Sequence, residues 1–390
     1  MTFDFEARPG LGSLIEDLVI ALAQQGQEVI VLSLETRVDP HAVPSSNPHV
    51  DIRRVRVPAL LERSPGIVRR LSTQILALGQ SMRLRATMPT RVVYFSPAFL
   101  TMGPAFLLTR GKRSKPVVVL VQWDFFPVHQ VEIGRLPRFA PRGLLKRVER
   151  AAIDLADAIV VMSPKNEEFL HSYHPGLRAQ VTTQAPWGGS ASDPLPEGSR
   201  ERAERFVVVF GGQLTAGRGV EDLLTAAQVL KQRDVPARIL IVGDGPHRER
   251  LVRQADDLAL TNVAFLGRMP RDSYLELLGT ASAGIAVTVS GVSIPSFPSK
   301  TVDYCRSGVA VIACTEETSD YGDVIENQAG GLACRAGDAL GLAGAIETLY
   351  EEWLDGSIDR RRVASRRFFL ERLTSEQAAS RVLAAGPARS

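Results

Sequence analysis

Short apolar runs and longer amphipathic stretches alternate twice along this chain. The apolar runs of the first half are EVIVLS (28–33), RVVYFS (91–96), PVVVLVQ (116–122) and AIVVMS (158–163). Those of the second half are RFVVVFGG (205–212), ARILIVGDG (237–245), NVAFLG (262–267), AGIAVTV (283–289) and VAVIAC (309–314). Runs of this length without alternating polar positions are typical of parallel strands that are buried on both faces.

Helical periodicity fills the intervals between these predicted strands. Examples are SLIEDLVIALAQQG (13–26), VEDLLTAAQVLKQR (220–233) and HRERLVRQADDLAL (247–260). Such alternation predicts two doubly wound, Rossmann-like α/β domains. We place the first at residues 1–185, a Pro-, Gly- and Ser-rich linker at 186–202 and the second at 203–370. Residues 371–390 are expected to form a helix that packs back on the first domain. Ligands of such sheets bind beyond the carboxyl ends of the strands, so the site is expected in a cleft between the domains.

Composition narrows the class of protein. The chain has 390 residues, of which 45% are hydrophobic, and three cysteines without metal-like spacing. This composition indicates a globular protein in a reducing compartment. Asp4, Glu6 and Arg8 interrupt the first residues, and no apolar run reaches 18 residues. We therefore expect neither a signal peptide nor a spanning helix, and a cytoplasmic location.

Basic residues are concentrated in the first half. Residues 1–185 hold 23 Lys and Arg against 16 Asp and Glu, whereas residues 186–390 hold 23 against 27. Three clusters carry much of this excess: Arg53, Arg54 and Arg56; Arg110, Lys112, Arg113 and Lys115; and Arg142, Lys146, Arg147 and Arg150. The excess indicates either a solvated surface or contact with an anionic membrane. No basic motif interleaved with aromatic residues points to nucleic acid.

Glycines mark two strand-to-helix junctions of the second domain. In GGQLTAGRG (211–219), Gly212 allows close approach to a ligand, and Arg218 precedes a helix N-terminus that favours an anion. In GDGPHRERL (243–251), Gly243 ends a strand and Asp244 is a candidate cap of the next helix. Either junction can also be an ordinary glycine-rich turn. Neither is a GxGxxG dinucleotide fingerprint.

Two further junctions add candidates for binding a nucleotide. Arg268 follows the strand NVAFLG and is placed to stack on a nucleobase. In PSFPSKTVDYCRSG (295–308), Ser299 is a possible N-cap, and Lys300 falls in the first helical turn. A cation is unfavourable at the positive end of a helix unless an anion binds there. We therefore expect Lys300 to meet a diphosphate. The alternative is an ion pair with Asp303, three residues on.

These motifs resemble the retaining glycosyltransferases of family 4, which have the GT-B fold. The resemblance rests on VVVFGGQLTAGRGVEDLL, ILIVGDGPHRERL, NVAFLGRMP and PSKTVDYCRSGVAVIA, in that order, across residues 205–335. The first domain is similar through PGLGSLIEDLVIALAQQGQEVIVLS. FSPAFLTMGPAFLL followed by VQWDFFPVHQVEIGRL resembles members that build bacterial surface polysaccharides.

The resemblance implies roles for matching positions. Arg218 and Lys300 would grip the donor diphosphate, and Asp303 would hold the ribose as the second acid of the E-x7-E pattern. Asp323 lies near a position that is often Glu, and Gly12 belongs to a loop that closes over the phosphates. Three departures stand out: Pro295 replaces the first acid, Gln213 replaces a basic residue, and the first strand is clipped to MTFDF.

The activity that follows is transfer of a sugar from a nucleotide-diphosphate sugar to a hydroxyl, with retention at the anomeric carbon. Without a DxD motif, we expect cationic side chains and helix N-termini, not a metal or another cofactor, to stabilise the leaving diphosphate. Asp124 and His129, in QWDFFPVHQ, are candidates to orient or deprotonate the acceptor hydroxyl. The aromatic residues of that segment are candidates either for stacking on a sugar or for the core.

Alternatives stay open at this point. A nucleotide-sugar epimerase on the same fold would turn over its donor without an acceptor. An NAD-dependent oxidoreductase would require a dinucleotide fingerprint, which is missing. A non-catalytic protein that binds a sugar nucleotide or a partner enzyme would bind donor without transfer. The acceptor is expected to be a glycan, a lipid-linked sugar or a small molecule. A peripheral place on the inner face of the cell membrane is the alternative to a purely cytoplasmic location.

Overall fold

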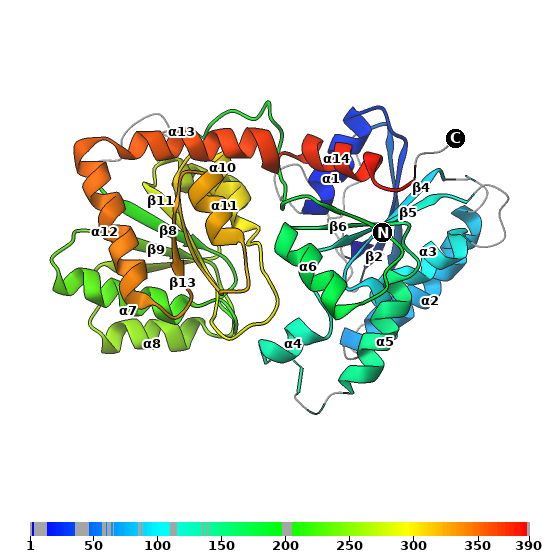
Figure 1. Cartoon of the computed structure of the whole chain (residues 1–390), viewed down its shortest axis with the longest axis horizontal. Helices are drawn as coiled ribbons and strands as arrows, with labels where there is room; N and C mark the ends of the chain where they lie inside the picture. Colours follow the sequence, from blue (N-terminus) through cyan, green and yellow to red (C-terminus); the bar gives the residue numbers. More distant parts are fainter. Residues whose placement is uncertain are drawn as a thin grey trace. The chain divides into compact units, whose positions relative to one another are not determined.

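A computed structural model describes residues 2–3, 14–35, 47–56, 60, 64, 66–84, 87, 89–109, 115–134, 136–137, 139, 141–196 and 205–387. The chain divides into two compact units (Figure 1). The N-terminal unit comprises Met1–Val131, Leu136–Ala185 and Ser375–Ser390, and the C-terminal unit comprises Glu132–Arg135 and Pro186–Thr374. In the latter, the Glu132 carboxylate accepts hydrogen bonds from the Ser293 N–H and hydroxyl.

The N-terminal unit holds two parallel sheets, with strand orders β1-β2-β3 and β4-β5-β6-β7. Its strands are β1 (Thr2–Phe3), β2 (Val29–Glu35), β3 (Val50–Arg56), β4 (Arg91–Phe95), β5 (Val117–Gln122), β6 (Ala158–Val161) and β7 (Gln180–Thr183). Its helices are α1 (Leu14–Gln24), α2 (Gly66–Leu84), η3 (Ala98–Leu100), α3 (Met102–Thr109), α4 (Val128–Glu132), α5 (Arg142–Ile153) and α6 (Pro164–Tyr173). Every residue of β5 and β6 is buried, as the unbroken apolar runs predicted.

The C-terminal unit is built on one six-stranded parallel sheet of order β10-β9-β8-β11-β12-β13. Its strands are β8 (Val207–Gly211), β9 (Arg238–Val242), β10 (Val263–Gly267), β11 (Ala283–Val287), β12 (Ala310–Thr315) and β13 (Leu332–Arg335). Its helices are α7 (Val220–Gln232), α8 (Arg248–Asp257), α9 (Arg271–Gly279), α10 (Lys300–Arg306), α11 (Tyr321–Gln328), α12 (Ala339–Asp355), α13 (Ile358–Phe368) and the π-helical turn η4 (Phe369–Leu373). The strand order reverses between β8 and β11, and crevices beyond such switch points are where ligands bind in α/β sheets.

The last helix, α14 (Ser375–Ala384), belongs to the N-terminal unit and lies beside α1 (Figure 1). The Gln25 amide donates to Glu376 O and Ser380 Oγ, and Arg91 donates to Leu383 O and Ala385 O. The C-terminal segment therefore packs on the N-terminal unit from residue 375. Residues 186–196 of the expected linker group with the C-terminal unit, and Trp187 is fully buried there.

Local patterns predicted most strands to within two residues. β3, β7 and β13 were not predicted. β3 carries Asp51 and three arginines among its seven residues, so its apolar pattern is broken. β7 and β13 have four residues each, which is too short for a clear period. β1 has two described residues, which pair with Ser33 and Leu34 of β2.

Candidate functional site

Two glycines bring the loops after β8 and β9 into close contact. The Gly212 N–H donates to Val242 O at 2.9 Å, and the Gly243 N–H donates to Gly267 O at 2.8 Å. Gly243 has a φ of +139°, and a Cβ atom at this residue would lie only 1.8 Å from Gly212 O. Only glycine fits there, because any side chain would push the two loops apart. The loops thus present bare backbone at the carboxyl ends of two central strands.

Lys300 reaches this backbone from α10. Its Nζ atom lies 3.7 Å from the centre of the Phe210 ring, and a Cβ atom on Gly212 would lie 3.5 Å from it. Nζ is buried, and within the described part of the chain it has no hydrogen-bond partner. Burial, and secondarily the positive charge of Arg218, hold the pKa of Lys300 well below its usual value. An ammonium in such surroundings is stabilised by an anion.

Arg218 and the N-terminus of α7 add positive potential to the same site. Arg218 is exposed, and its charge reaches Lys300. Gly219 is the N-cap of the 13-residue helix α7, with a φ of +61°, and a Cβ atom there would lie 2.1 Å from Thr288 O. The first turn of α7 therefore follows directly after Arg218, and within it the Asp222 N–H donates to Gly219 O at 3.2 Å. Two cations and a helix N-terminus form a site that suits a diphosphate.

The alternative interpretation of Lys300, an ion pair with Asp303, is wrong. Both guanidinium nitrogens of Arg271 donate to the Asp303 carboxylate, at 2.6 and 3.1 Å, and both side chains are largely buried. The planar guanidinium fork satisfies a carboxylate better than an ammonium does, so Asp303 is already neutralised by α9. Ser299 stands at the N-cap of α10, but its backbone is helical and its side chain makes no cap hydrogen bond, so it does not cap this helix.

The other described residues that were predicted to bind the donor are exposed to solvent. Asp244 is exposed and accepts from the Gly245 N–H at 2.8 Å; His247 is the N-cap of α8, so Asp244 does not cap that helix. Arg268 is exposed directly after β10, and Asp323 is exposed in the first turn of α11. Gly12 lies outside the described residues.

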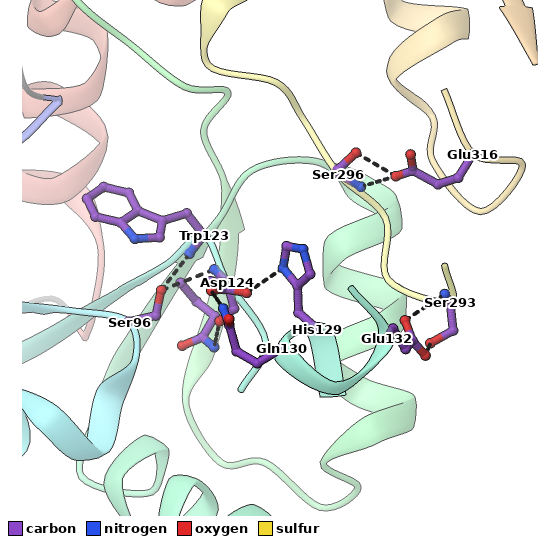
Figure 2. A network of polar contacts seen from close by, with 10 residues as sticks. Ser96, Trp123, Asp124, His129, Gln130, Glu132, Ser293, Ser296 and Glu316 are labelled. Carbon is purple, nitrogen blue, oxygen red and sulfur yellow. Dashed lines mark hydrogen bonds and ion pairs between the residues drawn. The ribbon is translucent and has the colours of Figure 1, made fainter. Parts of the chain in front are cut away.

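A buried carboxylate that the sequence analysis missed organises the segment before α10. Glu316, 5% exposed, accepts from the Ser296 N–H at 2.7 Å and from the Ser296 hydroxyl at 2.5 Å (Figure 2). It also accepts from the Thr288 hydroxyl at 2.5 Å. It therefore joins the ends of β11 and β12 to the turn that leads to Lys300. An acid two positions after the apolar run VAVIAC was the available signal.

In the N-terminal unit, Asp124 and His129 form a hydrogen-bonded pair (Figure 2). Asp124 Oδ1 lies 2.6 Å from His129 Nδ1, and Gln130 Nε2 donates to Asp124 Oδ2 at 3.0 Å. Burial raises the pKa of Asp124, but the His129 and Gln130 contacts outweigh it and lower that pKa below its usual value. An ionised carboxylate only accepts, so Nδ1 carries the proton, and a neutral His129 ring keeps the Nε2 lone pair for an acceptor hydroxyl.

The aromatic residues around this pair divide between core and surface. Phe125 is 2% exposed and meets Phe169 edge-on, so it belongs to the core. Phe126 packs on Phe99 with ring centres 4.8 Å apart, and the partly exposed Trp123 stacks on Phe95 at 5.1 Å. Trp123 therefore remains the candidate for contact with a sugar. The sequence analysis missed Ser96, whose hydroxyl accepts from the N–H groups of Trp123 and Asp124.

Comparison with known proteins gives a consistent assignment. Residues 192–366, most of the C-terminal unit, match the family described as glycosyl transferases group 1. The chain is 24% identical over 384 residues to the glycogen synthase of Mycobacterium tuberculosis, covering 94% of this chain and 87% of that protein. It is 23% identical over 347 residues to WcaI of Escherichia coli, named as a colanic acid biosynthesis glycosyl transferase, covering 83% and 84%.

Solved structures show the fold. Sucrose-phosphate synthase from Thermosynechococcus elongatus superposes with a TM-score of 0.75 at 16% identity, over 97% of this chain and 96% of that one. HepE of Anabaena, solved in complex with UDP and glucose, gives a TM-score of 0.66 at 14% identity, over 98% and 97%. The chain has the GT-B fold, and the matches together support a glycosyltransferase that uses a nucleotide-sugar donor.

Proposed function

We propose that this chain is a retaining glycosyltransferase that moves a sugar from a nucleoside-diphosphate sugar to a hydroxyl group of a glycan or a lipid-linked sugar. The observation that carries the proposal is the buried Nζ atom of Lys300, which lies beside bare backbone at the carboxyl ends of β8 and β9 and has no hydrogen-bond partner among the described residues. This arrangement falls within the segment that matches the glycosyl transferases group 1 family. Relatives named for the synthesis of glycogen and colanic acid favour a polysaccharide acceptor.

On the donor side, Lys300, Arg218 and the first turn of α7 bind the diphosphate. During transfer, the bond between the anomeric carbon and the diphosphate oxygen breaks, and negative charge develops on the leaving group. Cationic and backbone donors that are fixed beforehand stabilise this charge, and the proposal assigns that role to them and not to a metal ion. Arg268 is assigned to the nucleobase, while Asp303, held by Arg271, and Asp323 are assigned to the polar parts of the donor.

On the acceptor side, Asp124 holds His129 in the tautomer that presents Nε2. His129 then orients the acceptor hydroxyl or takes its proton as the new glycosidic bond forms. The neighbouring Trp123 offers a face on which a sugar ring can stack. Among the described contacts, no second carboxylate pairs with Asp124 as in a two-carboxylate glycosidase, so we assign no protein nucleophile to the retaining step.

The decisive experiment is a transfer assay with a panel of nucleotide sugars and glycan acceptors. We expect nucleoside diphosphate to be released only when an acceptor is present. NMR of the product is expected to show the anomeric configuration of the donor. Donor turnover without an acceptor would indicate the epimerase, which the comparisons do not favour, and an inverted anomeric centre would refute retention. Asp124→Asn and His129→Gln are expected to reduce kcat and to leave donor binding intact.

We further propose that α5 holds the protein against an anionic membrane that carries the acceptor. Among the described residues, no helix is long and apolar enough to cross a bilayer. On α5, however, Leu144 and Val148 are 60% and 37% exposed, and the exposed Arg147 lies between them. An exposed apolar stripe beside positive charge suits the interface of an anionic lipid layer.

Other basic residues contribute less to this surface. Arg150 binds Asp154 and the carbonyl of Pro175, Lys146 lies over the Tyr173 ring, and Arg53 pairs with Asp51. The cluster at 110–113 lies outside the described residues. The first half is therefore less free to bind anions than its charge alone suggests.

Vesicle flotation tests the membrane proposal. Vesicles with phosphatidylglycerol should float the wild type at low salt, and Leu144→Glu should abolish flotation. Leu340→Glu is the matched control, because Leu340 is 62% exposed on α12. If the wild type does not float with the vesicles, or if both variants float equally, α5 is not a membrane-binding surface.

A further inference from the structure

A second buried carboxylate lies on the inner face of α5. Glu149 is fully buried, and its two oxygens accept from the N–H groups of Ala98 at 2.9 Å and Phe99 at 3.0 Å. These N–H groups open the short helix η3, which follows β4. One side chain of α5 thus fixes the turn after β4.

The same turn holds the segment that carries the Asp124–His129 pair. The Ser96 N–H donates to Val121 O at 3.0 Å, at the end of β5. The Ser96 hydroxyl accepts from the N–H groups of Trp123 and Asp124 at 3.1 Å each (Figure 2). Only Pro97 separates Ser96 from the residues that Glu149 holds. A displacement of the turn is therefore transmitted to the backbone of Asp124.

Gln122 provides a second connection between the same groups. It is 1% exposed, and its Nε2 donates to Asp124 O at 2.6 Å. Its side chain also lowers the pKa of Glu149. Its Oε1 is buried and, among the described residues, has no hydrogen-bond partner. The carboxylic O–H of a protonated Glu149 is the kind of hydrogen-bond donor that Gln122 Oε1 lacks. Both connections lead from Glu149 to Asp124.

The environment of Glu149 permits its proton to come and go near neutral pH. Burial raises the pKa of Glu149 to about 7, with the negative charge of Asp124 adding to the rise, while the Phe99 and Ala98 N–H groups and Gln122 oppose it. Among the described residues, the titratable groups coupled to its charge are Asp124, after β5, and Tyr94, on β4. Ionised Glu149 accepts from both N–H groups, whereas the protonated acid gives up part of that capacity to an O–H donor.

We propose that Glu149 is a positioning residue for the Asp124–His129 pair, and that its ionised form, acting through the turn at Ser96 and through Gln122, holds the pair in the geometry for transfer. This proposal rests on the acceptor role given above to that pair. Glu149 itself contacts neither substrate. Protonation loosens the turn and lowers the rate of transfer without changing the affinity for the donor.

The first test does not depend on activity. Amide ¹H–¹⁵N shifts of Ala98, Phe99, Trp123 and Asp124 are followed from pH 5 to 9 in the full-length protein. All four should titrate with a common midpoint near the Glu149 pKa of about 7. None should show that midpoint in Glu149→Gln. Asp157→Asn is the matched control, because Asp157 accepts from the Val118 N–H at the other end of β5, and it should behave as the wild type.

A second variant keeps the test informative if Glu149→Gln fails to fold. Ser96→Ala leaves Glu149 with its two N–H donors but removes the hydroxyl that holds the Trp123 and Asp124 N–H groups. Ala98 and Phe99 should still titrate, and the response of Trp123 and Asp124 should be reduced or lost. Titration of Ala98 and Phe99 alone in the wild type would overturn the proposal.

Kinetics then connect the coupling to the reaction. Misplacing a reacting group by about 1 Å can cost up to about 100-fold in rate. We therefore expect kcat of Glu149→Gln to fall about 10- to 100-fold above pH 8, with an unchanged KM for the donor. The wild type should approach the variant as the pH falls below 7. A variant with the wild-type pH profile would sink the proposal. If the amides respond together but Asp124→Asn keeps full activity, the coupling stands and the acceptor role of the pair fails.

Discussion

Replacing Lys300 with methionine tests the donor site most directly. Methionine keeps an apolar stem of similar length over the Phe210 ring and removes the buried Nζ. A hydrogen bond to a charged group is worth about 1.5–3 kcal/mol. Loss of the ammonium should therefore weaken binding of a nucleoside diphosphate about 10- to 150-fold.

Thermal shift measures this loss. At 100 times its Kd, a nucleotide stabilises the wild type by about 2.7 kcal/mol, and the weakened variant at the same concentration by about 0.3–1.3 kcal/mol. At about 2–4 °C per kcal/mol for a unit of this size, a shift of about 5–11 °C should fall to about 1–5 °C. UDP is the first nucleotide to try, because the similar structure of HepE was solved with UDP.

The unliganded protein should respond in the opposite direction. Burial lowers the pKa of Lys300 in the folded state, so below the unfolded pKa of about 10.4 the unfolded chain binds more protons. This difference costs stability at neutral pH, and the cost disappears as the pH rises towards the unfolded pKa. Lys300→Met should therefore unfold at a higher temperature than the wild type at pH 7, with a difference that shrinks towards pH 10.

Lys231→Met is the control, because Lys231 donates to Ala259 O at the far end of α7. It should keep the wild-type response to nucleotide. If Lys300→Met responds to the stabilising nucleotide as the wild type does, the ammonium does not meet the diphosphate and the reasoning fails. If Lys300→Met is less stable than the wild type at pH 7, other groups of the free protein already compensate the charge of the ammonium.

Three other substitutions test the geometry elsewhere. Gly243→Ala places a methyl group against Gly212 O and should cost about 1–3 kcal/mol in urea unfolding, with weaker nucleotide binding; unchanged stability would refute the close approach. Arg271→Met leaves Asp303 unpaired and should cost about 1–3 kcal/mol, which Asp303→Asn in the same chain should partly restore. The lowered pKa of Asp124 contributes stability that is present above its unfolded pKa and is lost as the pH falls through the folded pKa, so Asp124→Asn should approach the wild type in acid; a pH-independent difference would contradict the stabilisation of the ionised carboxylate by its His129 and Gln130 contacts.

Local sequence patterns were sufficient for most of the strands and for the glycine junctions. A buried parallel strand requires an unbroken apolar run, and a sharp exit from it requires glycine, so both features are visible within about ten residues. Gly212 and Gly243 were found in this way. The contact between them was not, because it depends on the register of β8 and β9, which pair at Gly211 and Val242.

Interactions between distant segments could not be predicted. The pairing of Asp303 with Arg271 spans 32 positions, and local spacing offered only Lys300 as a partner. Glu149 is 51 positions from Ala98, and nothing in the pattern of α5 distinguishes it from a solvated glutamate. Buried carboxylates of this kind are recognised by the N–H groups that converge on them, and these come from other parts of the chain.

Lys300 shows how one prediction can rest on two different physical arguments. The sequence argument relied on the unfavourable position of a cation in a first helical turn, which is a modest effect. In the structure the stronger reason is desolvation, together with a neighbouring carboxylate that is already neutralised by Arg271. If Asp303 bound Lys300, the site would have little need of an anion. The charge that remains at this site thus depends on which side chains pair with one another: Arg271 on α9 binds Asp303, and Lys300 on α10 has no hydrogen-bond partner among the described residues.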